Sequence, residues 1–328
     1  MPSYAIIGGG AFLAVHFAKY LLAQTSTEKV ISIGRNPQRS EAFTLGVGRG
    51  DSRYAYEQAH IVFEPERLFK LLDRFNPEYI VNFAALPYTG TFVGSFHHYN
   101  TNVVALSRLC EHLAECSCFK KLLHISTSAL YGSVNHPASE EYPVNPTSPY
   151  AISKLAADLH LKILWLAKKF PMNILRPSNV YGPGQQLCQL LPKAVYCGLI
   201  GKKVPLEGGL AKRSYMHAYD FAKAIFLILH NADFGEVFNI GPDNPVTIRH
   251  LVELVARGIN LEFEDIANIL PGRVGEDAVY WLDSSKIKSR LGYKETVSLE
   301  QGIDDMINWG RKYLDLLYDE PCKFVPTA

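Results

Sequence analysis

The stretch "IIGGGAFLAVHF" (residues 6–17) joins a short apolar run to a helical pattern through consecutive glycines. Such a turn lets backbone amides approach a pyrophosphate, which lies at the positive end of the helix dipole. Gly8, Ala11 and Ala14 occupy the places of a G-x-x-G-x-x-G spacing, so two of its three glycines are alanine. A tight structural turn is the alternative, but the position at the start of the first strand–helix–strand unit favours a dinucleotide site.

The first half of the chain repeats this alternation of apolar runs and helical patterns. The apolar runs lie at 4–8, 30–34, 78–85 and 120–126. Strands without polar alternation are typical of a parallel sheet that helices cover on both faces. We therefore expect an α/β fold, a Rossmann-type doubly wound parallel sheet, formed mainly by residues 1–177. A smaller C-terminal lobe is expected at 178–328, with helices near 186–199, 220–231, 247–257 and 299–316 and a strand at 235–240.

Composition sets limits on the possible partners. The 328 residues carry a net charge of +1, which offers nothing to nucleic acid or an anionic membrane surface. No window reaches the ~20 apolar residues that span a bilayer, and the first residues lack a signal-peptide pattern. We expect a soluble, cytoplasmic protein. The cysteines, including the "CSC" at 116–118, match neither a paired zinc-ligand spacing nor a CxxC motif, so free thiols and no metal are expected.

The end of the second apolar run bears on the choice of cofactor. A domain that binds NAD usually has an acidic residue there, which holds the adenosine ribose. This chain has Gly34, followed by Arg35 and Asn36. A glycine leaves room for a 2′-phosphate and an arginine offers it several donors, so the sequence favours NADP. NAD stays open if Arg35 is a solvated loop residue.

Two further stretches, "STSALYG" (126–132) and "PYAISK" (149–154), contain a possible reactive group. Tyr150 and Lys154 stand four apart at the start of a predicted helix, so they share one face. A neighbouring ammonium lowers a tyrosine pKa from about 10, which makes Tyr150 a candidate base for an alcohol proton. Thr127 follows a buried strand at the sheet edge where ligands bind, and it can bond the same oxygen. The set predicts hydride transfer on an alcohol.

With these motifs the chain resembles the extended short-chain dehydrogenase/reductases, in particular the nucleotide-sugar epimerase/dehydratase group. The likeness runs from about residue 4 to 315. It also rests on "IVNFAAL", "NTNVVAL", "HISTSALYG", "SPYAISKLAAD", "RPSNVYGPGQQ", "KRSYMHAYDFAKAI", "EVFNIG" and "RVGEDAVYWLDSSKIKSRLGY". It implies an NAD(P)-binding Rossmann domain that includes the Tyr150–Lys154 helix, a catalytic set of Thr127, Tyr150 and Lys154, and a nucleoside-diphosphate sugar held by the C-terminal lobe.

The resemblance also implies binding residues. The cofactor contacts carried over are Gly8, Ala11, Phe12, Leu13, Arg35, Asn36, His60, Ile61, Ala84, Ala85, Tyr150 and Lys154. The substrate contacts are Ser128, Ala129, Asn179, Arg213 and Arg273, of which the last three match the residues that hold the diphosphate. Surface ion pairs are the alternative for the two arginines. Asp220 is expected to cap or pack a helix.

Ser128 and Ala129 bear on the reaction. The 4,6-dehydratases of this group look like "STDEVYG" or "STSELYG", and their acidic residues serve the elimination of water. Here Ala129 replaces the glutamate. Losing a positioned acid/base costs about 10²–10⁴-fold, which favours a 4-epimerase or a 4-dehydrogenase/ketoreductase. A 4,6-dehydratase stays open, since a glutamate-to-alanine change in one would give the same letters. A non-catalytic NADP-binding sensor is the alternative from another class, but it would need neither Tyr150 nor Lys154.

The helices expected near 96–115 and 150–169 carry apolar residues beyond one stripe, among them Leu159, Ile163, Trp165 and Leu166. In the family, the matching helices pair across a two-fold axis as a four-helix bundle, which implies a homodimer. The alternative is that both stripes cover the sheet.

Overall fold

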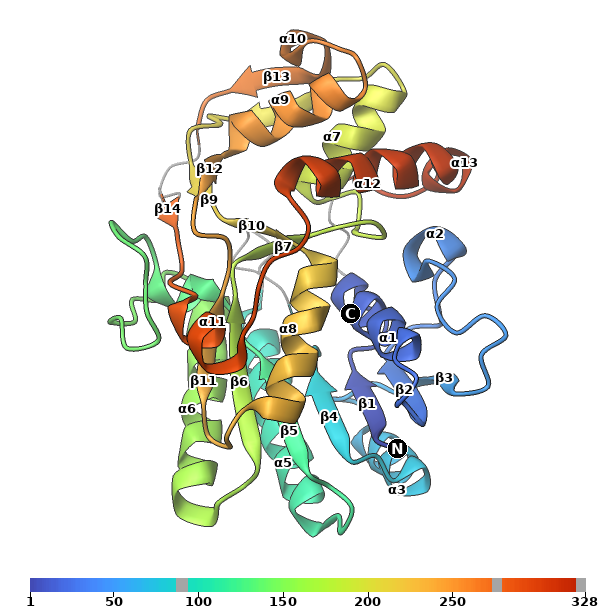
Figure 1. Ribbon diagram of the computed structural model, residues 1–328, viewed down its shortest axis with the longest axis vertical. Helices are drawn as coiled ribbons and strands as arrows, with labels where there is room; N and C mark the ends of the chain where they lie inside the picture. Colours follow the sequence, from blue (N-terminus) through green and yellow to red (C-terminus); the bar gives the residue numbers. More distant parts are fainter. Residues whose placement is uncertain (87–93, 273–278, 323–328) are drawn as a thin grey trace.

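A computed structural model describes residues 1–86, 94–272 and 279–322. Its centre is a seven-stranded sheet in the order β11-β6-β5-β4-β1-β2-β3, parallel throughout (Figure 1). The strands are β1 (Ser3–Ile7), β2 (Lys29–Gly34), β3 (Tyr54–Gln58), β4 (Tyr79–Asn82), β5 (Lys121–Ile125), β6 (Met172–Pro177) and β11 (Val237–Ile240). The predicted doubly wound sheet is confirmed. Its strand order reverses between β1 and β4, where such sheets bind ligands.

Strand β1 shows why the strands read as unbroken apolar runs. Successive side chains point to opposite faces, so Tyr4 and Ile6 enter one core while Ala5 and Ile7 enter another. Helices α1 (Phe12–Ala23) and α8 (Ala218–Asn231) pack on the sheet in the first core. Helices α3 (Pro65–Phe75), α5 (Ala105–Glu115) and α6 (Pro149–Lys168) cover the other face.

The upper part of the molecule in Figure 1 surrounds a separate core. Its helices are α7 (Leu190–Leu199), α9 (Ile248–Gly258), α10 (Phe263–Ile266), α12 (Leu299–Lys312) and α13 (Leu314–Leu317). Its strand pairs are β7 (Asn179–Tyr181) with β10 (Tyr215–His217), β8 (Val204–Glu207) with β13 (Ala267–Leu270), and β9 (Lys212–Arg213) with both β12 (Val246–Thr247) and β14 (Val279–Tyr280).

The two parts share segments. Helix α2 (Glu41–Thr44) belongs to the first half of the chain but packs into the upper core, where Trp309 Nε1 donates to Ala42 O at 2.6 Å. Conversely, β11 and α8 of the second half lie in and against the main sheet, beside α11 (Ser285–Leu291). The division after residue 177 therefore stays a prediction.

A π-helical turn, Asn100–Val104, joins α4 (Ser95–Tyr99) to α5. Such turns often occur at functional sites. Asn102 within it is buried, donates from Nδ2 to Ser153 Oγ at 2.9 Å, and accepts at Oδ1 from Leu86 N at 3.0 Å. Ser153 Oγ in turn donates to Tyr150 O at 2.7 Å. The turn thereby ties the loop after β4 to the start of α6.

Among the described residues, none of the helices combines the length and the apolar character needed to cross a membrane.

Candidate functional site

Tyr150 and Thr127 meet at the carboxyl edge of the sheet. Pro149 is the first residue of α6, and Ser148 Oγ accepts from Ala151 N at 3.2 Å, so local sequence starts the helix here. Thr127 directly precedes a short 3₁₀ helix, Ser128–Tyr131, and its side chain is hydrogen-bonded to that of Tyr150. The structure thus brings together the threonine and tyrosine that the sequence predicted.

Lys154 lies one turn further along α6 and is buried. Its Nζ donates to Ile125 O at 2.6 Å and lies 2.9 Å from His124 Nε2. Burial lowers the Lys154 pKa to about 8, against the opposing charge of Asp158. A substantial fraction of this lysine is therefore uncharged at mildly alkaline pH.

His124 continues the chain of contacts behind Lys154. It is fully buried, and burial followed by the charge of Lys154 lowers its pKa well below the usual value, so the ring is neutral. Its Nδ1 lies 3.2 Å from Asn82 Nδ2, while Asn82 Oδ1 accepts from Ala84 N at 3.0 Å. A neutral imidazole has one donor and one acceptor. Because the Asn82 amide donates to Nδ1, Nε2–H donates to Lys154 Nζ, and this fits an uncharged amine.

Sequence reasoning missed His124 and Asn82. The available signal was a polar residue near the end of each of two apolar runs, "KLLHI" and "IVNFAA".

The expected effect of Lys154 on Tyr150 is not confirmed. Burial raises the pKa of Tyr150, and the bond to Thr127 only partly offsets it. One reason is that Lys154 Nζ is hydrogen-bonded to His124 and Ile125 O. The other is that the pKa of Lys154 is itself lowered, so this lysine holds less positive charge to stabilise a Tyr150 phenolate. In this structure Tyr150 is a neutral phenol.

The glycine turn fits a dinucleotide. Gly8 has φ +83°, and a Cβ there would come within 2.7 Å of Ala84 N, so only glycine lets β1 pass this close to the loop after β4. Ala11 precedes α1, and no side chain caps its first turn. The amides of Phe12 and Leu13 are thereby left for an anionic group.

The argument for NADP fails at Gly34. A Cβ there would overlap the Tyr56 hydroxyl, which donates to Asn36 O at 2.7 Å. The space that glycine was expected to leave for a 2′-phosphate is occupied by Tyr56. Burial lowers the pKa of the His60 ring, and the nearby charge of Arg35 lowers it further.

The remaining predicted cofactor residues follow strands of the same sheet. His60 Nδ1 accepts from Val62 N at 3.1 Å, so this ring shapes the turn after β3, and Ile61 packs on the core below it. Ala84 and Ala85 follow β4, next to the glycine turn. Their positions line the region where the strand order reverses.

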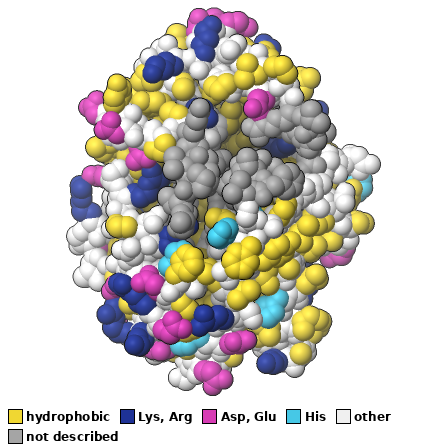
Figure 2. Space-filling model, turned by 180° about the vertical axis from the view of Figure 1, so that it is seen from behind, with side chains coloured by type: hydrophobic (Ala, Val, Ile, Leu, Met, Phe, Trp, Pro, Cys, Tyr) yellow, Lys and Arg dark blue, Asp and Glu magenta, His cyan; other side chains and the backbone are white. Residues whose placement is uncertain are grey.

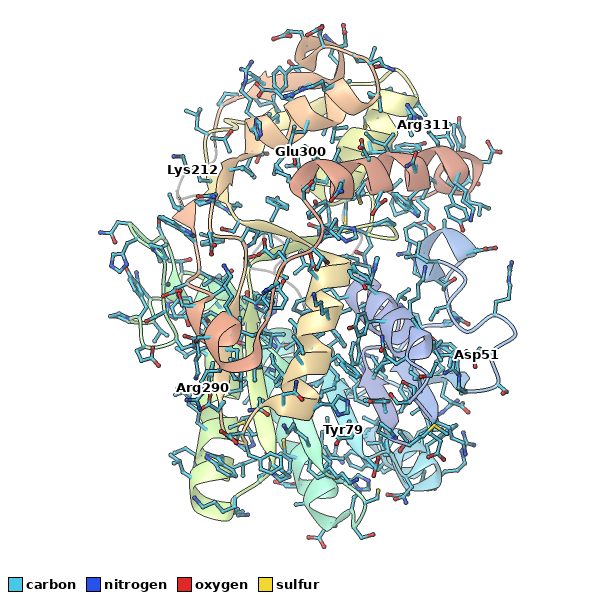
Figure 3. The ribbon with its side chains drawn as sticks, viewed as in Figure 1. Asp51, Tyr79, Lys212, Arg290, Glu300 and Arg311 are labelled. Carbon is cyan, nitrogen blue, oxygen red and sulfur yellow. The ribbon has the colours of Figure 1, made fainter. Side chains whose placement is uncertain are left out.

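The predicted substrate residues lie in the part that faces this edge. Tyr215 on β10 bonds the Asn179 side chain and feels the charge of Arg213. Arg213 is buried, and its guanidinium lies 4.4 Å from the centre of the Tyr280 ring. It therefore does not lie at the surface. Figure 3 labels its neighbour Lys212 on β9. Arg273 lies outside the described residues.

Ser128 and Ala129 adjoin Thr127, and Ala129 N donates to Thr127 Oγ1 at 3.2 Å. Tyr131 anchors this short helix, because its hydroxyl donates to Asn239 Oδ1 at 2.9 Å and accepts from Arg176 Nη1 at 2.7 Å. Asp220 has a structural role, as expected, although its carboxylate binds the loop before α12. It accepts from Thr296 N, Thr296 Oγ1 and Val297 N.

Comparison with known proteins places these features in context. A dTDP-D-glucose 4,6-dehydratase of Mus musculus is 28% identical over 323 residues, which cover 94% of this chain and 88% of the relative. A trifunctional UDP-glucose 4,6-dehydratase/epimerase/reductase of Arabidopsis thaliana is 26% identical over 93% of this chain. The chain spans about half the length of that relative, 46%. The expected preference for an epimerase over a dehydratase is not confirmed by these relatives.

Solved structures show the same fold. A dTDP-glucose 4,6-dehydratase of Bacillus anthracis in complex with NAD has a TM-score of 0.86 at 29% identity, covering 96% of this chain and 98% of its own. A UDP-glucose 4-epimerase of Thermotoga maritima with UDP-glucose has 0.85 at 25% identity, covering 95% and 99%. The expectation of NADP is not supported, since the family is NAD-dependent. The sequence model described as "NAD dependent epimerase/dehydratase family" matches residues 4–241. The chain belongs to the NAD-dependent epimerase/dehydratase family.

Proposed function

We propose that this protein oxidises C4 of a nucleoside-diphosphate sugar by hydride transfer to NAD. The observation that carries the proposal is the hydrogen-bonded Thr127–Tyr150 pair beside buried Lys154, at the edge where the glycine turn lies. Gly8, the uncapped start of α1 and the loop after β4 would hold NAD, which supplies a hydride acceptor when bound. Asn179 and Arg213 would hold the diphosphate in the C-terminal lobe.

The proton of the C4 hydroxyl passes to Tyr150. Tyr150 and Lys154 act as a coupled pair, because a neutral phenol with a neutral amine holds as many protons as a phenolate with an ammonium. The active pair has therefore lost one proton relative to the fully protonated state. His124, by donating to Nζ, favours that loss, and we assign it as a positioning residue for Lys154.

The fate of the ketone decides the overall reaction. Ala129 offers no carboxylate for the elimination of water, which supports return of the hydride to C4 in a 4-epimerase, or release of the ketone in a dehydrogenase. A 4,6-dehydratase is the second candidate, and the identity of the relatives favours it.

Sugars deuterated at C4 separate these outcomes. UDP-, dTDP-, GDP- and CDP-hexoses would be incubated with NAD and analysed by mass spectrometry. Label back at C4 of a mass-neutral isomer identifies an epimerase. Label at C6 of a product lighter by one water identifies a dehydratase, and label in reduced cofactor identifies a dehydrogenase. No turnover, with NAD bound tightly, would refute the proposal in favour of a sensor. Ala129→Glu should raise the share of dehydrated product.

NAD is the proposed cofactor because Tyr56 fills the space beside Gly34. Titration of the protein with NAD and NADP should show tighter binding of NAD. Tyr56→Ala should narrow the difference between the affinities for NAD and NADP. Tyr318→Ala, a change at an exposed tyrosine, should leave that difference unchanged. Equal affinities in the wild type would contradict the assignment.

A homodimer is proposed from the helices that cover one face of the sheet. Apolar side chains gather over the face shown in Figure 2. The exposed ones on α4, the π-helical turn and α6 are Phe96, Tyr99, Val104, Ile152, Leu159, Ile163 and Leu166. Trp165 is not among them, because it packs against Phe234 and Gly235 of the same chain.

Light scattering after size-exclusion chromatography tests the dimer. Leu159→Lys together with Leu166→Lys should produce monomers. Leu210→Lys, at a site equally apolar and 79% exposed, should not. A monomeric wild type at micromolar concentration would contradict the proposal.

A further inference from the structure

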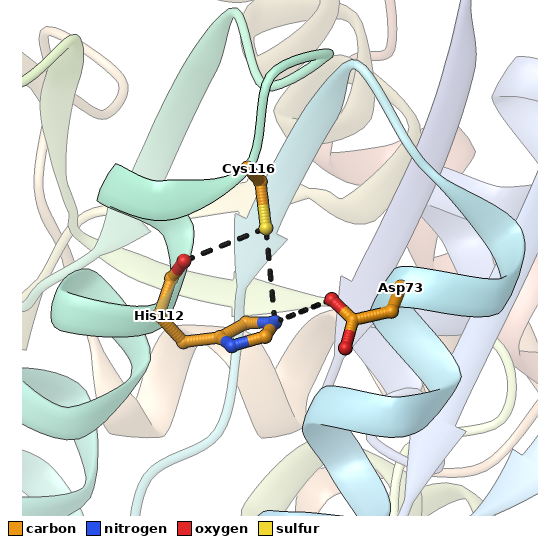
Figure 4. A group of neighbouring side chains, drawn as sticks. All are labelled: Asp73, His112 and Cys116. Carbon is orange, nitrogen blue, oxygen red and sulfur yellow. Dashed lines mark hydrogen bonds and ion pairs between the residues drawn. The ribbon is translucent and has the colours of Figure 1, made fainter.

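A second group of chemically active side chains lies at the opposite edge of the sheet. Asp73 is near the end of α3, and His112 and Cys116 are near the end of α5, just before β4 and β5 begin (Figure 4). His112 lies in the last turn of α5, and Cys116 directly follows that helix, so both side chains lie at the same helix end. No part of the proposed reaction uses them.

From this geometry we propose a binding site for a divalent transition-metal cation of the zinc type, formed by Asp73, His112 and Cys116. One ligand atom from each residue lies within 4.8 Å of the other two. His112 Nε2 is 3.0 Å from Asp73 Oδ1 and 3.7 Å from Cys116 Sγ. Carboxylate, imidazole and thiolate are all zinc ligands.

These separations fit a tetrahedral ion. Zinc bonds of about 2.0–2.3 Å at tetrahedral angles place nitrogen about 3.4 Å from oxygen and about 3.6 Å from sulfur. The observed separations differ from these by a few tenths of an ångström or less. The His112 ring is held in place by stacking on Phe69, with centroids 4.4 Å apart and planes 8° apart. The third separation, between the Asp73 carboxylate and Cys116 Sγ, is no more than 4.8 Å before a cation enters.

The surrounding charge favours a cation, because the carboxylates of Asp73 and Glu115 both lie near the Cys116 sulfur. The metal replaces the thiol proton, so an S–metal bond forms, the S–H bond breaks, and one proton leaves to solvent, while the proton on His112 Nε2 moves to Nδ1 so that Nε2 can bind the ion. Asp73 is 58% exposed in its side chain, which leaves the site open to ions from solution.

Cys118 provides a matched control. It lies in the same turn, but its Sγ donates to Asn76 Oδ1 at 2.5 Å, a partner outside the group. The fourth position of the ion is thereby left to water. The simpler account of the same contacts is an ion pair between His112 and Asp73 with a thiol that donates to His112 O at 3.4 Å.

The test is a titration of the reduced, chelator-treated full-length protein with Co²⁺ and then Zn²⁺. We expect one equivalent of cobalt with a sulfur-to-cobalt charge-transfer band, displacement by zinc, and release of one proton. Cys116→Ser should abolish the band, and Asp73→Asn and His112→Asn should each weaken binding by at least about tenfold. Cys118→Ser should bind as the wild type does.

Absence of the band, or a band that survives Cys116→Ser, would overturn the site. Loss of the band only in Cys118→Ser would do the same. Thermal unfolding of each variant without metal verifies that the fold is intact, and hydride transfer should be unchanged because none of these residues touches the reacting atoms.

Discussion

A histidine lies beside an ionisable partner near each end of strand β5. The two histidines differ in burial, in the charge of the partner and in the role that we assign to them. His124 at the carboxyl end is fully buried next to Lys154 and is held neutral. His112, in the helix that leads to the amino end, has a side chain 18% exposed and pairs with the carboxylate of Asp73. Burial beside an amine makes a histidine a fixed hydrogen-bonding group, whereas partial exposure beside a carboxylate suits it to bind a cation. The residue type alone decides neither role.

The largest expected difference between the two ends is in catalysis. Tyr150→Phe removes the group that accepts the sugar proton, so turnover should fall by about 10²–10⁴-fold. Cys116→Ser, at the other end, should leave turnover unchanged. Single-turnover reduction of NAD, followed by absorbance, measures both. Equal losses of turnover in Tyr150→Phe and Cys116→Ser would contradict the assignment of catalysis to the carboxyl end of β5 alone.

The second difference concerns stability against pH. The folded-state pKa of Lys154, about 8, lies below its ordinary 10.5, so between these values the unfolded chain binds more protons. Stability contributed by this group therefore rises with pH across that interval, by up to about 3 kcal/mol. Urea unfolding at pH 8 and 10 should show a larger rise in the wild type than in Lys154→Met, because the variant keeps the contribution of Lys121, whose pKa burial also lowers to about 8. A parallel pH dependence in both would contradict the assignment.

The third difference is in the chain behind Lys154. His124→Phe leaves Asn82 Nδ2 without an acceptor and the lone pair of Lys154 Nζ without a donor. This should lower the free energy of unfolding by about 1–3 kcal/mol. Loss of the bond to Nζ should also raise the Lys154 pKa. Because the active pair has lost one proton, activity should rise with pH through about 8 in the wild type and at higher pH in the variant.

A pH–rate profile of kcat measures this shift, and His112→Asn is its control. A merely structural His124 would lower stability and leave the midpoint of the profile where it was.

The smallest effect is expected at the exposed pair. Asp73→Asn breaks the ion pair with His112, and exposed pairs contribute about 0–1 kcal/mol. Without metal, the free energy of unfolding should change by no more than that. A loss of unfolding free energy comparable to that of His124→Phe would show that the contacts of Asp73 contribute as much to stability as those of His124.

Much of the fold could be predicted because the deciding patterns are local. Apolar runs marked β1, β2, β4 and β5 of the main sheet but not β3, whose sequence "YAYEQ" is half polar, and "SPYAISK" contains both the N-cap Ser148 and the first-turn Pro149 of α6. Thr127 and Tyr150 could be placed together because each lies at a strand or helix end that faces the same edge.

The errors share one cause, which is pairing between strands. Asn82 and His124 are partners in the β4–β5 register, and Tyr56 pairs with Ser32 in the β2–β3 register. A single sequence does not contain these registers, so the buried bonds of Lys154 and the filling of the space at Gly34 could not be anticipated. The prediction of NADP assumed free space beside Gly34 and did not take Tyr56 on the neighbouring strand β3 into account.

The π-helical turn at Asn100–Val104 has a consequence for how this surface can change. An α-helix advances about 100° per residue, so one extra residue in a turn sets the segments on either side out of phase by that angle. The outward direction of Phe96 and Tyr99 is therefore not tied to the inward direction of Leu106 and Leu109. Deleting a single residue there would restore a regular helix and rotate α4 about its own axis. The exposed side chains of α4 would then face a new direction, and buried His98 and the bonds of Asn102 would have to move with them.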